Sequence, residues 1–312
     1  MASVLSWVAF AVVILFMLAL DLGVFHRRVH EVRMKEALVW SGVWIVVALL
    51  FNAAVYYVKG KEAALQFLAG YVLERSLSFD NLFIFLLVFN YFHLPSRFHH
   101  RVLFWGIFGA LIMRAIFIGL GIEAIRHFSW MIYLFGVVLI WTGIKLAVEK
   151  EQKVEPEKNI FVKAFRRFFP VTESYEEGKF FTRKNGVLLA TPLMVILLVI
   201  ETTDVVFAVD SIPAILAISR DPFIVYTSNV FAILGLRALY FALAELMRLF
   251  HHLHYGLALI LFLIGVKMLI SHYIHVPTTV ALGAILFILA ASVIASIIWP
   301  QKLEGSYGAT AS

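Results

Sequence analysis

Long apolar stretches recur along the whole sequence, and short polar segments separate them. An α-helix rises 1.5 Å per residue, so about 20 apolar residues cross the roughly 30 Å hydrocarbon core of a bilayer. Stretches near this length predict nine transmembrane helices, at 7–25, 37–58, 63–92, 102–122, 129–147, 187–218, 223–247, 255–271 and 276–299. The expected fold class is all-α, a polytopic membrane protein.

The composition agrees with a membrane protein. Hydrophobic residues make up 62% of the 312 residues and charged residues 15%, whereas soluble domains carry about 25% charged residues. The first apolar stretch follows an uncharged start without a small-residue cleavage site, so we expect a retained helix rather than a signal peptide. The chain has no cysteine, which excludes disulfides and thiolate metal sites.

The basic residues are distributed unequally between alternate loops. If the N-terminus is outside, 17 of the 26 Lys and Arg residues fall in inside loops and four in outside loops. Positive charge is retained in the cytoplasm, so we expect an inner (plasma) membrane protein with an outside N-terminus and a cytoplasmic C-terminus. This orientation explains the net charge of +6 without nucleic-acid binding.

Five basic residues remain inside predicted spans, and all of them except Arg75 belong to a repeated pattern. Asp80, Arg114 and Lys145 follow one another at spacings of 34 and 31 residues. The matching positions of a second segment, at spacings of 33 and 30 residues, are Asp204, Arg237 and Lys267. We infer two three-helix units, spans three to five and six to eight. Because three is odd, the second unit would be inverted in the bilayer, as in many secondary transporters.

The repeat defines the expected organisation of the chain. We assign 1–62 to two N-terminal helices, 63–148 to the first repeat, 149–186 to a cytoplasmic linker, 187–272 to the second repeat, and 273–312 to a C-terminal helix and tail. In the linker, Phe161, Phe165 and Phe168 recur at helical spacing among basic residues. This pattern is typical of an amphipathic helix on an anionic membrane surface.

Five carboxylates lie inside the third and sixth spans. In the third span, Glu74 shares a helix face with Ser78 and Asn81, while Asp80 lies about 120° away from Glu74. Buried acids in a span are paired or functional. The set therefore indicates ion or proton handling, with a structural charge network balanced by Arg114 and Arg237 as the alternative.

The sixth span carries the other acids. Glu201, Asp204 and Ser211 share a stripe, whereas Asp210 points roughly opposite Glu201 on a regular helix. Pro213 predicts a kink or an unwound turn, which could re-aim Asp210, and Pro192 a bend nearer the start.

The side chains around these acids indicate the kind of ion. They are amide and hydroxyl oxygens, and the histidines fall in loops or at span ends. Oxygen ligands suit hard divalent cations such as Mg²⁺, Ca²⁺ or Mn²⁺. Protons are the natural exchange partner of clustered carboxylates. No phosphate loop, dinucleotide fingerprint or catalytic triad pattern is found, so we expect neither an enzyme, nor a permanently bound cofactor, nor ATP-driven transport.

The motifs LERSLSFDNLF, ETTDVVFAVDSIPAI and TSNVFAILGLRALYF, with FFTRKNG before the sixth span, resemble the TerC family, named for tellurium resistance, in the branch that contains Alx. The resemblance implies an exporter superfamily, with manganese efflux near Alx and tellurite resistance or metal loading of exported proteins elsewhere. It places on the metal route Glu74, Asp80, Asn81, Glu201, Asp204 and Asp210. The charge partners are Arg114 and Arg237, and the supporting residues Ser78, Thr203 and Ser211.

Two functions remain open from the sequence. The first is a transporter that exports a hard divalent cation, Mn²⁺ as the leading substrate, in exchange for protons. The second is a non-transporting membrane scaffold of a metal- or tellurite-stress complex, in which the linker recruits a protein partner. Both place the chain in a lipid bilayer, and only the first requires an ion to reach the carboxylates.

Overall fold

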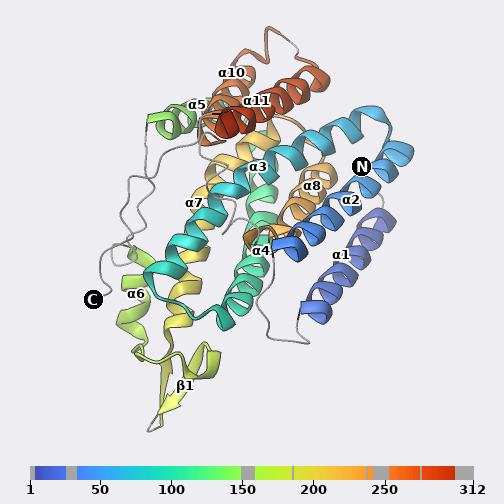
Figure 1. The fold of residues 1–312 in the computed structure, drawn as a ribbon. Helices are drawn as coiled ribbons and strands as arrows, with labels where there is room; N and C mark the ends of the chain where they lie inside the picture. The colour runs from blue at the N-terminus through green and yellow to red at the C-terminus, as the bar shows by residue number, and fades with distance from the viewer. Residues whose placement is uncertain are drawn as a thin grey trace.

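A computed structural model describes residues 4–25, 34–148, 159–184, 186–236, 238–241, 253–274 and 276–298. Its elements, in chain order, are α1 (Val4–Phe25), α2 (Met34–Lys59), α3 (Lys61–Tyr91), α4 (Ser96–His127), α5 (Met131–Val148), α6 (Ile160–Phe168), the 3₁₀ turn η2 (Glu176–Gly178), β1 (Phe181–Lys184), β2 (Val187–Ala190), α7 (Pro192–Leu216), α8 (Pro222–Leu234), α10 (Leu253–Ile270) and α11 (Thr278–Ile298). The fold is a helical bundle with one short hairpin (Figure 1).

Each predicted span overlaps a described helix, but not every helix has the length and polarity of a span. Within the described ranges, six helices are long and apolar enough to cross a membrane, namely α2, α4, α5, α7, α10 and α11. Helix α3 has 31 residues but carries Glu74, Arg75 and Asp80, and α8 has only 13 residues. The prediction of a polytopic all-α membrane protein is confirmed at this level.

Helices α3, α4, α7 and α8 form the centre of the molecule. Helix α3 packs against α8 and α7, and α4 packs against α7 and α8. Helices α1 and α2 flank this centre on one side, while α5, α10 and α11 lie together at another edge (Figure 1). The central four helices therefore enclose many of the most deeply buried side chains.

Helices α5 and α10 contact each other through their backbones. A Cβ atom added to Gly265 would lie 2.7 Å from the carbonyl oxygen of Gly136, and one added to Gly143 would lie 2.7 Å from that of Ala258. The contacts advance along α5 while they retreat along α10, so the two helices are antiparallel. Small residues permit this close approach, as in many membrane helix pairs.

The polar connection before α7 differs from the prediction. Residues 187–190, which we assigned to a span, form β2 and pair antiparallel with β1, from Phe181 opposite Ala190 to Lys184 opposite Val187. Helix α7 begins only at Pro192, which occupies its first turn. Proline lacks an N–H group and is favoured at that position, so Pro192 starts the helix instead of bending it.

The unwound turn expected at Pro213 is also wrong, because α7 remains helical through this residue to Leu216. The span predicted at 223–247 is interrupted instead, since α8 ends at Leu234 and Gly235 forms a turn. Arg75 of α3 lies against Gly235 and donates a hydrogen bond of 2.9 Å to the carbonyl oxygen of Ala232. A cation at this end of a helix satisfies carbonyl groups that lack intrahelical partners.

The linker contains the expected amphipathic helix as α6. Asn159 caps it by accepting hydrogen bonds from Phe161 N and Val162 N, and Val162 is buried. The Asn159 side chain also donates a 2.7 Å hydrogen bond to the Thr202 hydroxyl of α7. Helix α6 is therefore fastened to α7 at one end and presents Phe161 and Phe168 on the surface.

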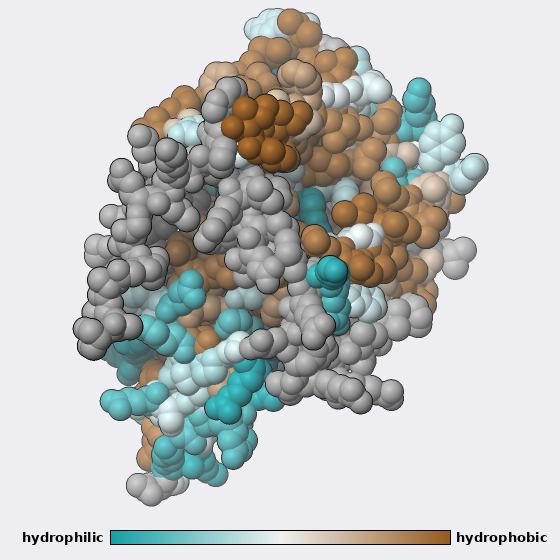
Figure 2. Space-filling view, viewed as in Figure 1, coloured by the Kyte–Doolittle hydropathy of each residue, from teal (hydrophilic) through white to brown (hydrophobic). Residues whose placement is uncertain are grey.

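The surface divides into an apolar body and a hydrophilic end. Brown, hydrophobic side chains cover much of the upper body in Figure 2, and teal, hydrophilic side chains gather at the lower end, where Figure 1 places α6 and β1. Beside the hairpin, Lys184 Nζ lies 2.6 Å from Glu176 Oε1. Hydrogen bonds from Lys184 and Ser174 lower the pKa of Glu176. This end has the polarity expected of a segment in water at the membrane surface.

Candidate functional site

A cluster of charged and amide side chains occupies the centre of the bundle. It comprises Glu74, Ser78 and Asn81 of α3, Arg114 of α4, Asp204 and Ser211 of α7, and Asn229 of α8. We call this group the Arg114 cluster. All seven residues are buried, and the Arg114 side chain is only 2% exposed.

The guanidinium of Arg114 joins the two acids of the cluster. Its Nη1 atom forms a short ion pair with Glu74 Oε1, and its Nη2 atom lies 3.3 Å from Asp204 Oδ1. The Nη1 atom also lies 3.4 Å from Ser211 Oγ and 3.4 Å from Asn229 Oδ1. Arginine remains charged throughout the physiological pH range, so this cation is permanent.

The two acids differ in how completely they are hydrogen-bonded. Glu74 Oε1 also accepts from Ser78 at 3.3 Å, and Glu74 Oε2 accepts from Asn229 Nδ2 at 2.9 Å. Asp204 Oδ1 accepts from Arg114 and from Asn81 Nδ2 at 3.3 Å. Asp204 Oδ2 is buried and has no hydrogen-bond partner in the described part of the chain. A buried carboxylate oxygen without a donor is costly, so Asp204 is the acid that remains open to a further ligand.

Glu201 lies one turn before Asp204 and points toward α4. A Cβ atom added to Gly109 would lie 2.0 Å from Glu201 Oε1. Glu201 is within electrostatic range of Asp204. No hydrogen bond or ion pair connects it to any other described residue. Gly109 therefore leaves the space that this carboxylate occupies.

The other two predicted acids lie apart from the Arg114 cluster. Asp80 is partly buried on α3 and has no hydrogen-bond or ion-pair partner among the described residues. Asp210 accepts a 2.6 Å hydrogen bond from Thr142 Oγ1 of α5 and lies within electrostatic range of Lys145. Asp210 and Glu201 thus face different helices, α5 and α4. The predicted acids therefore lie in four places: the Arg114 cluster, Glu201, Asp80 and Asp210.

The predicted supporting residues also separate. Ser78 and Ser211 belong to the Arg114 cluster, whereas the Thr203 hydroxyl bonds to the Val199 carbonyl oxygen of its own helix at 2.7 Å. Arg237, the second predicted charge partner, lies outside the described residues. Within those residues, no group of three or more His, Asp or Glu side chains is close enough to hold a metal ion. The described arrangement holds a guanidinium between the carboxylates.

Three contact residues of these acids were missed from the sequence. They are Asn229 beside Glu74, Gly109 beside Glu201 and Thr142 beside Asp210. Asn229 had a usable signal, because an amide inside an apolar span needs a hydrogen-bond partner. Gly109 had none, since a glycine that makes room for a side chain looks like any other glycine in a membrane helix.

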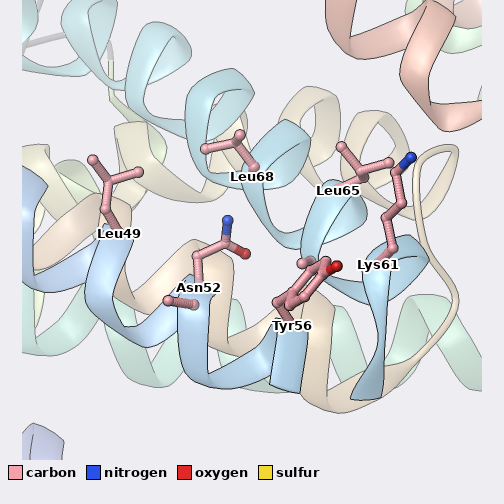
Figure 3. Close-up of a pocket in the computed structure, with 8 residues that line it drawn as sticks. Leu49, Asn52, Tyr56, Lys61, Leu65 and Leu68 are labelled. Atoms are coloured by element: carbon pink, nitrogen blue, oxygen red, sulfur yellow. The ribbon is translucent and has the colours of Figure 1, made fainter. Parts of the chain in front are cut away.

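A groove of about 360 Å³ lies elsewhere, between α2 and α3. Figure 3 shows its residues on these two helices, with Asn52 directed toward the space between them. The lining is Leu49, Asn52, Ala53, Tyr56, Lys61, Ala64, Leu65 and Leu68. It contains no carboxylate, so this groove lacks the oxygen ligands that a hard cation requires.

Comparison with known proteins gives closely similar relatives. The chain is 47% identical over 292 residues to the membrane protein STKORF319 of Myxococcus xanthus. The aligned region covers 94% of this chain and 92% of that protein. It is 47% identical over 294 residues to a protein of Escherichia coli K12 named as a proposed membrane-bound redox modulator, Alx, with 91% and 92% covered. It is 40% identical over 294 residues to a membrane protein of Rickettsia bellii, with 94% and 97% covered.

No solved structure matches the chain. The sequence description of the integral membrane protein TerC family matches residues 59–304. This range begins at the end of α2 and includes α3 to α11, and hence every residue of the Arg114 cluster. The relatives and the family match agree with the resemblance found in the sequence motifs. The chain belongs to the TerC family of integral membrane proteins.

Proposed function

We propose that this protein is a membrane transporter that exports a hard divalent cation, with Mn²⁺ as the leading substrate, in exchange for protons. The observation that carries the proposal is the unpartnered Oδ2 atom of Asp204, which is buried beside a second carboxylate, Glu74. Two acids face one guanidinium, so one negative charge of the cluster is not neutralised. Acids inside membrane spans are rare, and most of them are paired or functional.

The chemistry of the acids favours a hard cation. Asp80 and Glu201 are carboxylates without partners among the described residues, and Asp204 offers one free oxygen. Carboxylate and amide oxygens prefer Mg²⁺, Ca²⁺ or Mn²⁺ to softer metals. In the described arrangement these acids are not gathered around one point. Binding would therefore require α3 and α7 to bring them together, as expected for a carrier that alternates between two states.

The helix contacts support an inverted repeat of α3, α4 and α5 with α7, α8 and α10. In this repeat α3 corresponds to α7, α4 to α8, and α5 to α10. The α3–α8 contact then has the α7–α4 contact as its counterpart, and both are extensive. The α5–α10 contact is its own counterpart. In the register that aligns Lys145 with Lys267, Gly136 matches Ala258 and Gly143 matches Gly265, so the contacts of Gly136 with Gly265 and of Gly143 with Ala258 are exchanged.

This symmetry and the predicted orientation would define the transport path. The acids of α3 and α7 would lie near mid-membrane between two oppositely oriented units, where secondary transporters bind substrate. With the basic loops in the cytoplasm of the inner membrane, the N-terminus outside and the C-terminus inside, release of the ion to the outside would be export.

A scaffold function is the alternative, in which the Arg114 cluster only holds the bundle together and the linker recruits a protein. The exposed Phe161 and Phe168 of α6 favour it. The redox role stated in the Alx name would act here without thiol chemistry, because this chain has no cysteine.

Uptake of Mn²⁺ into proteoliposomes that contain only the purified protein decides between the two functions. We expect uptake by the native chain and a loss of about tenfold or more in Asp204→Asn, Glu201→Gln and Asp80→Asn, because each change removes a charge that the ion needs. Glu123→Gln is the matched control, since Glu123 is an exposed acid paired with Arg126 at the end of α4. It should transport normally.

Two outcomes would contradict the transporter. One is the absence of Mn²⁺ uptake by the native protein in sealed vesicles, and the other is normal uptake by all three acid variants. If the acid variants instead fail to accumulate in the membrane while the native protein does not transport, the scaffold function gains support.

A further inference from the structure

The guanidinium of Arg114 occupies the position between two carboxylates that a bound cation would take. It contacts Glu74 from α3 and Asp204 from α7, and so bridges the two halves of the bundle. Each acid lies on a different helix of the centre, and Arg114 comes from a third, α4. A cation shared by the same two carboxylates would have to displace the guanidinium from at least one of them.

Neutral hydrogen-bond acceptors lie beside the Arg114 guanidinium. Its Nη1 atom already lies 3.4 Å from both Ser211 Oγ and Asn229 Oδ1, which are neutral acceptors. These groups could retain hydrogen bonds to the guanidinium after the carboxylates are lost. Its Nε atom is buried and has no partner in the described part of the chain, so the side chain is not bonded through every donor. Arg114 is held between alternative acceptors.

We propose that Arg114 is a tethered cation that takes the place of the transported ion between Glu74 and Asp204 when the site is empty. This inference rests on the proposed transport function and explains how the metal-free carrier returns. Two bare carboxylates in a medium of low dielectric are costly. The guanidinium neutralises one of the two negative charges and an exchanged proton neutralises the other, so the protein can change its direction of opening without a bound metal ion.

The proposal separates two kinds of flux. Net uptake requires the metal-free, protonated site to return across the membrane, whereas exchange of external labelled Mn²⁺ for internal unlabelled Mn²⁺ requires only the metal-loaded site to move. A structural role for Arg114 would affect both fluxes together. A tethered cation affects only the step in which no metal ion is bound.

The test measures net uptake and exchange of ⁵⁴Mn²⁺ in the same proteoliposomes. In Arg114→Gln we expect the ratio of net uptake to exchange to fall about tenfold or more, with exchange retained, because the empty acids lose their counter-charge. Arg75→Gln is the matched control. Arg75 is also an arginine of the bundle centre, but it donates its hydrogen bond to the Ala232 carbonyl oxygen rather than to an acid, so the ratio should remain that of the native chain.

Arg114→Lys covers the case in which the glutamine variant does not fold, which we would judge by size-exclusion chromatography. Lysine keeps the charge but lacks the planar fork that reaches two carboxylates at once, so the ratio should again fall. A ratio equal to the native value in the folded variant would overturn the proposal, as would an equal loss of both fluxes. If the native protein shows neither flux, the proposed function itself fails.

Discussion

Charged side chains in the centre of the bundle have very different surroundings. Arg114 has four acceptors from α3, α7 and α8, whereas Glu201 and Asp80 have no hydrogen-bond or ion-pair partner among the described residues. Acids inside a membrane span that lack a partner are available for a ligand. The acids of α3 and α7 are thus divided, since Glu74 and Asp204 bind Arg114 whereas Asp80 and Glu201 do not.

Gly109 gives a direct test of the space around Glu201. In Gly109→Ala the new methyl group would lie 2.0 Å from Glu201 Oε1, so the carboxylate must move. We expect Mn²⁺ uptake into proteoliposomes to fall by about tenfold, while the protein remains folded, because a displacement near 1 Å at a binding group has effects of this order or larger.

Gly119→Ala is the control for this change. Gly119 lies on the same helix, α4, and no atom lies within 4 Å of the added methyl group. It should transport like the native chain. Equal uptake by the two alanine variants would show that the position of the Glu201 carboxylate is unimportant.

The helices were predictable because bilayer thickness fixes their length and composition. The departures occur where a local contact overrides that rule. Pro192 starts α7 and leaves 187–190 free to form β2, and Gly235 with Arg75 ends α8. The sequence contains these residues, but it does not contain the three-dimensional contact that gives Arg75 its role.

The candidate site was predictable in part for the same reason. Residues that share a helix face, such as Glu74 and Ser78, were grouped correctly from a spacing of four. The pairing of Glu74 with Asn229, and of Asp210 with Thr142, depends on how helices far apart in the chain pack together. Periodicity within one helix carries no information about the partner helix.

Helix α6 combines exposed basic and aromatic residues and is expected to contact anionic lipid. Arg166 and Arg167 contribute about 1 kcal/mol each near an anionic surface. Amide hydrogen exchange of 160–168 should therefore be slower in nanodiscs with anionic lipid than in neutral ones. The double change Arg166→Gln and Arg167→Gln should remove the difference.

High salt should also remove the protection of α6, because it screens charges exposed to water. Lys61→Gln, in the first turn of α3, is the control and should leave the difference unchanged. If neutral and anionic nanodiscs give the same exchange in the native protein, α6 does not recognise lipid charge.

On the scale of the whole molecule, the α5–α10 contact is one of the extensive contacts between the two halves of the chain. Gly265→Leu would place its Cβ atom 2.7 Å from the Gly136 carbonyl oxygen. Overpacking of this kind costs about 1–3 kcal/mol, so the melting temperature of the purified protein in detergent should fall by several degrees.

Gly283→Leu is the comparison for this experiment. Gly283 lies on α11, also at the edge of the molecule, and an added Cβ atom meets nothing within 4 Å. Its melting temperature should match that of the native chain. Melting of both variants at one temperature would mean that the close backbone approach contributes little to the assembly of the halves.

The hydrogen bond between Asn159 and Thr202 connects the surface helix α6 to the central helix α7. Thr202 lies two residues before Asp204 on α7, at 2.7 Å from the capping side chain of α6. A protein that bound α6 would therefore displace the turn of α7 that carries the open carboxylate, without contacting the Arg114 cluster itself. In the proposed transporter, such binding would slow the carrier.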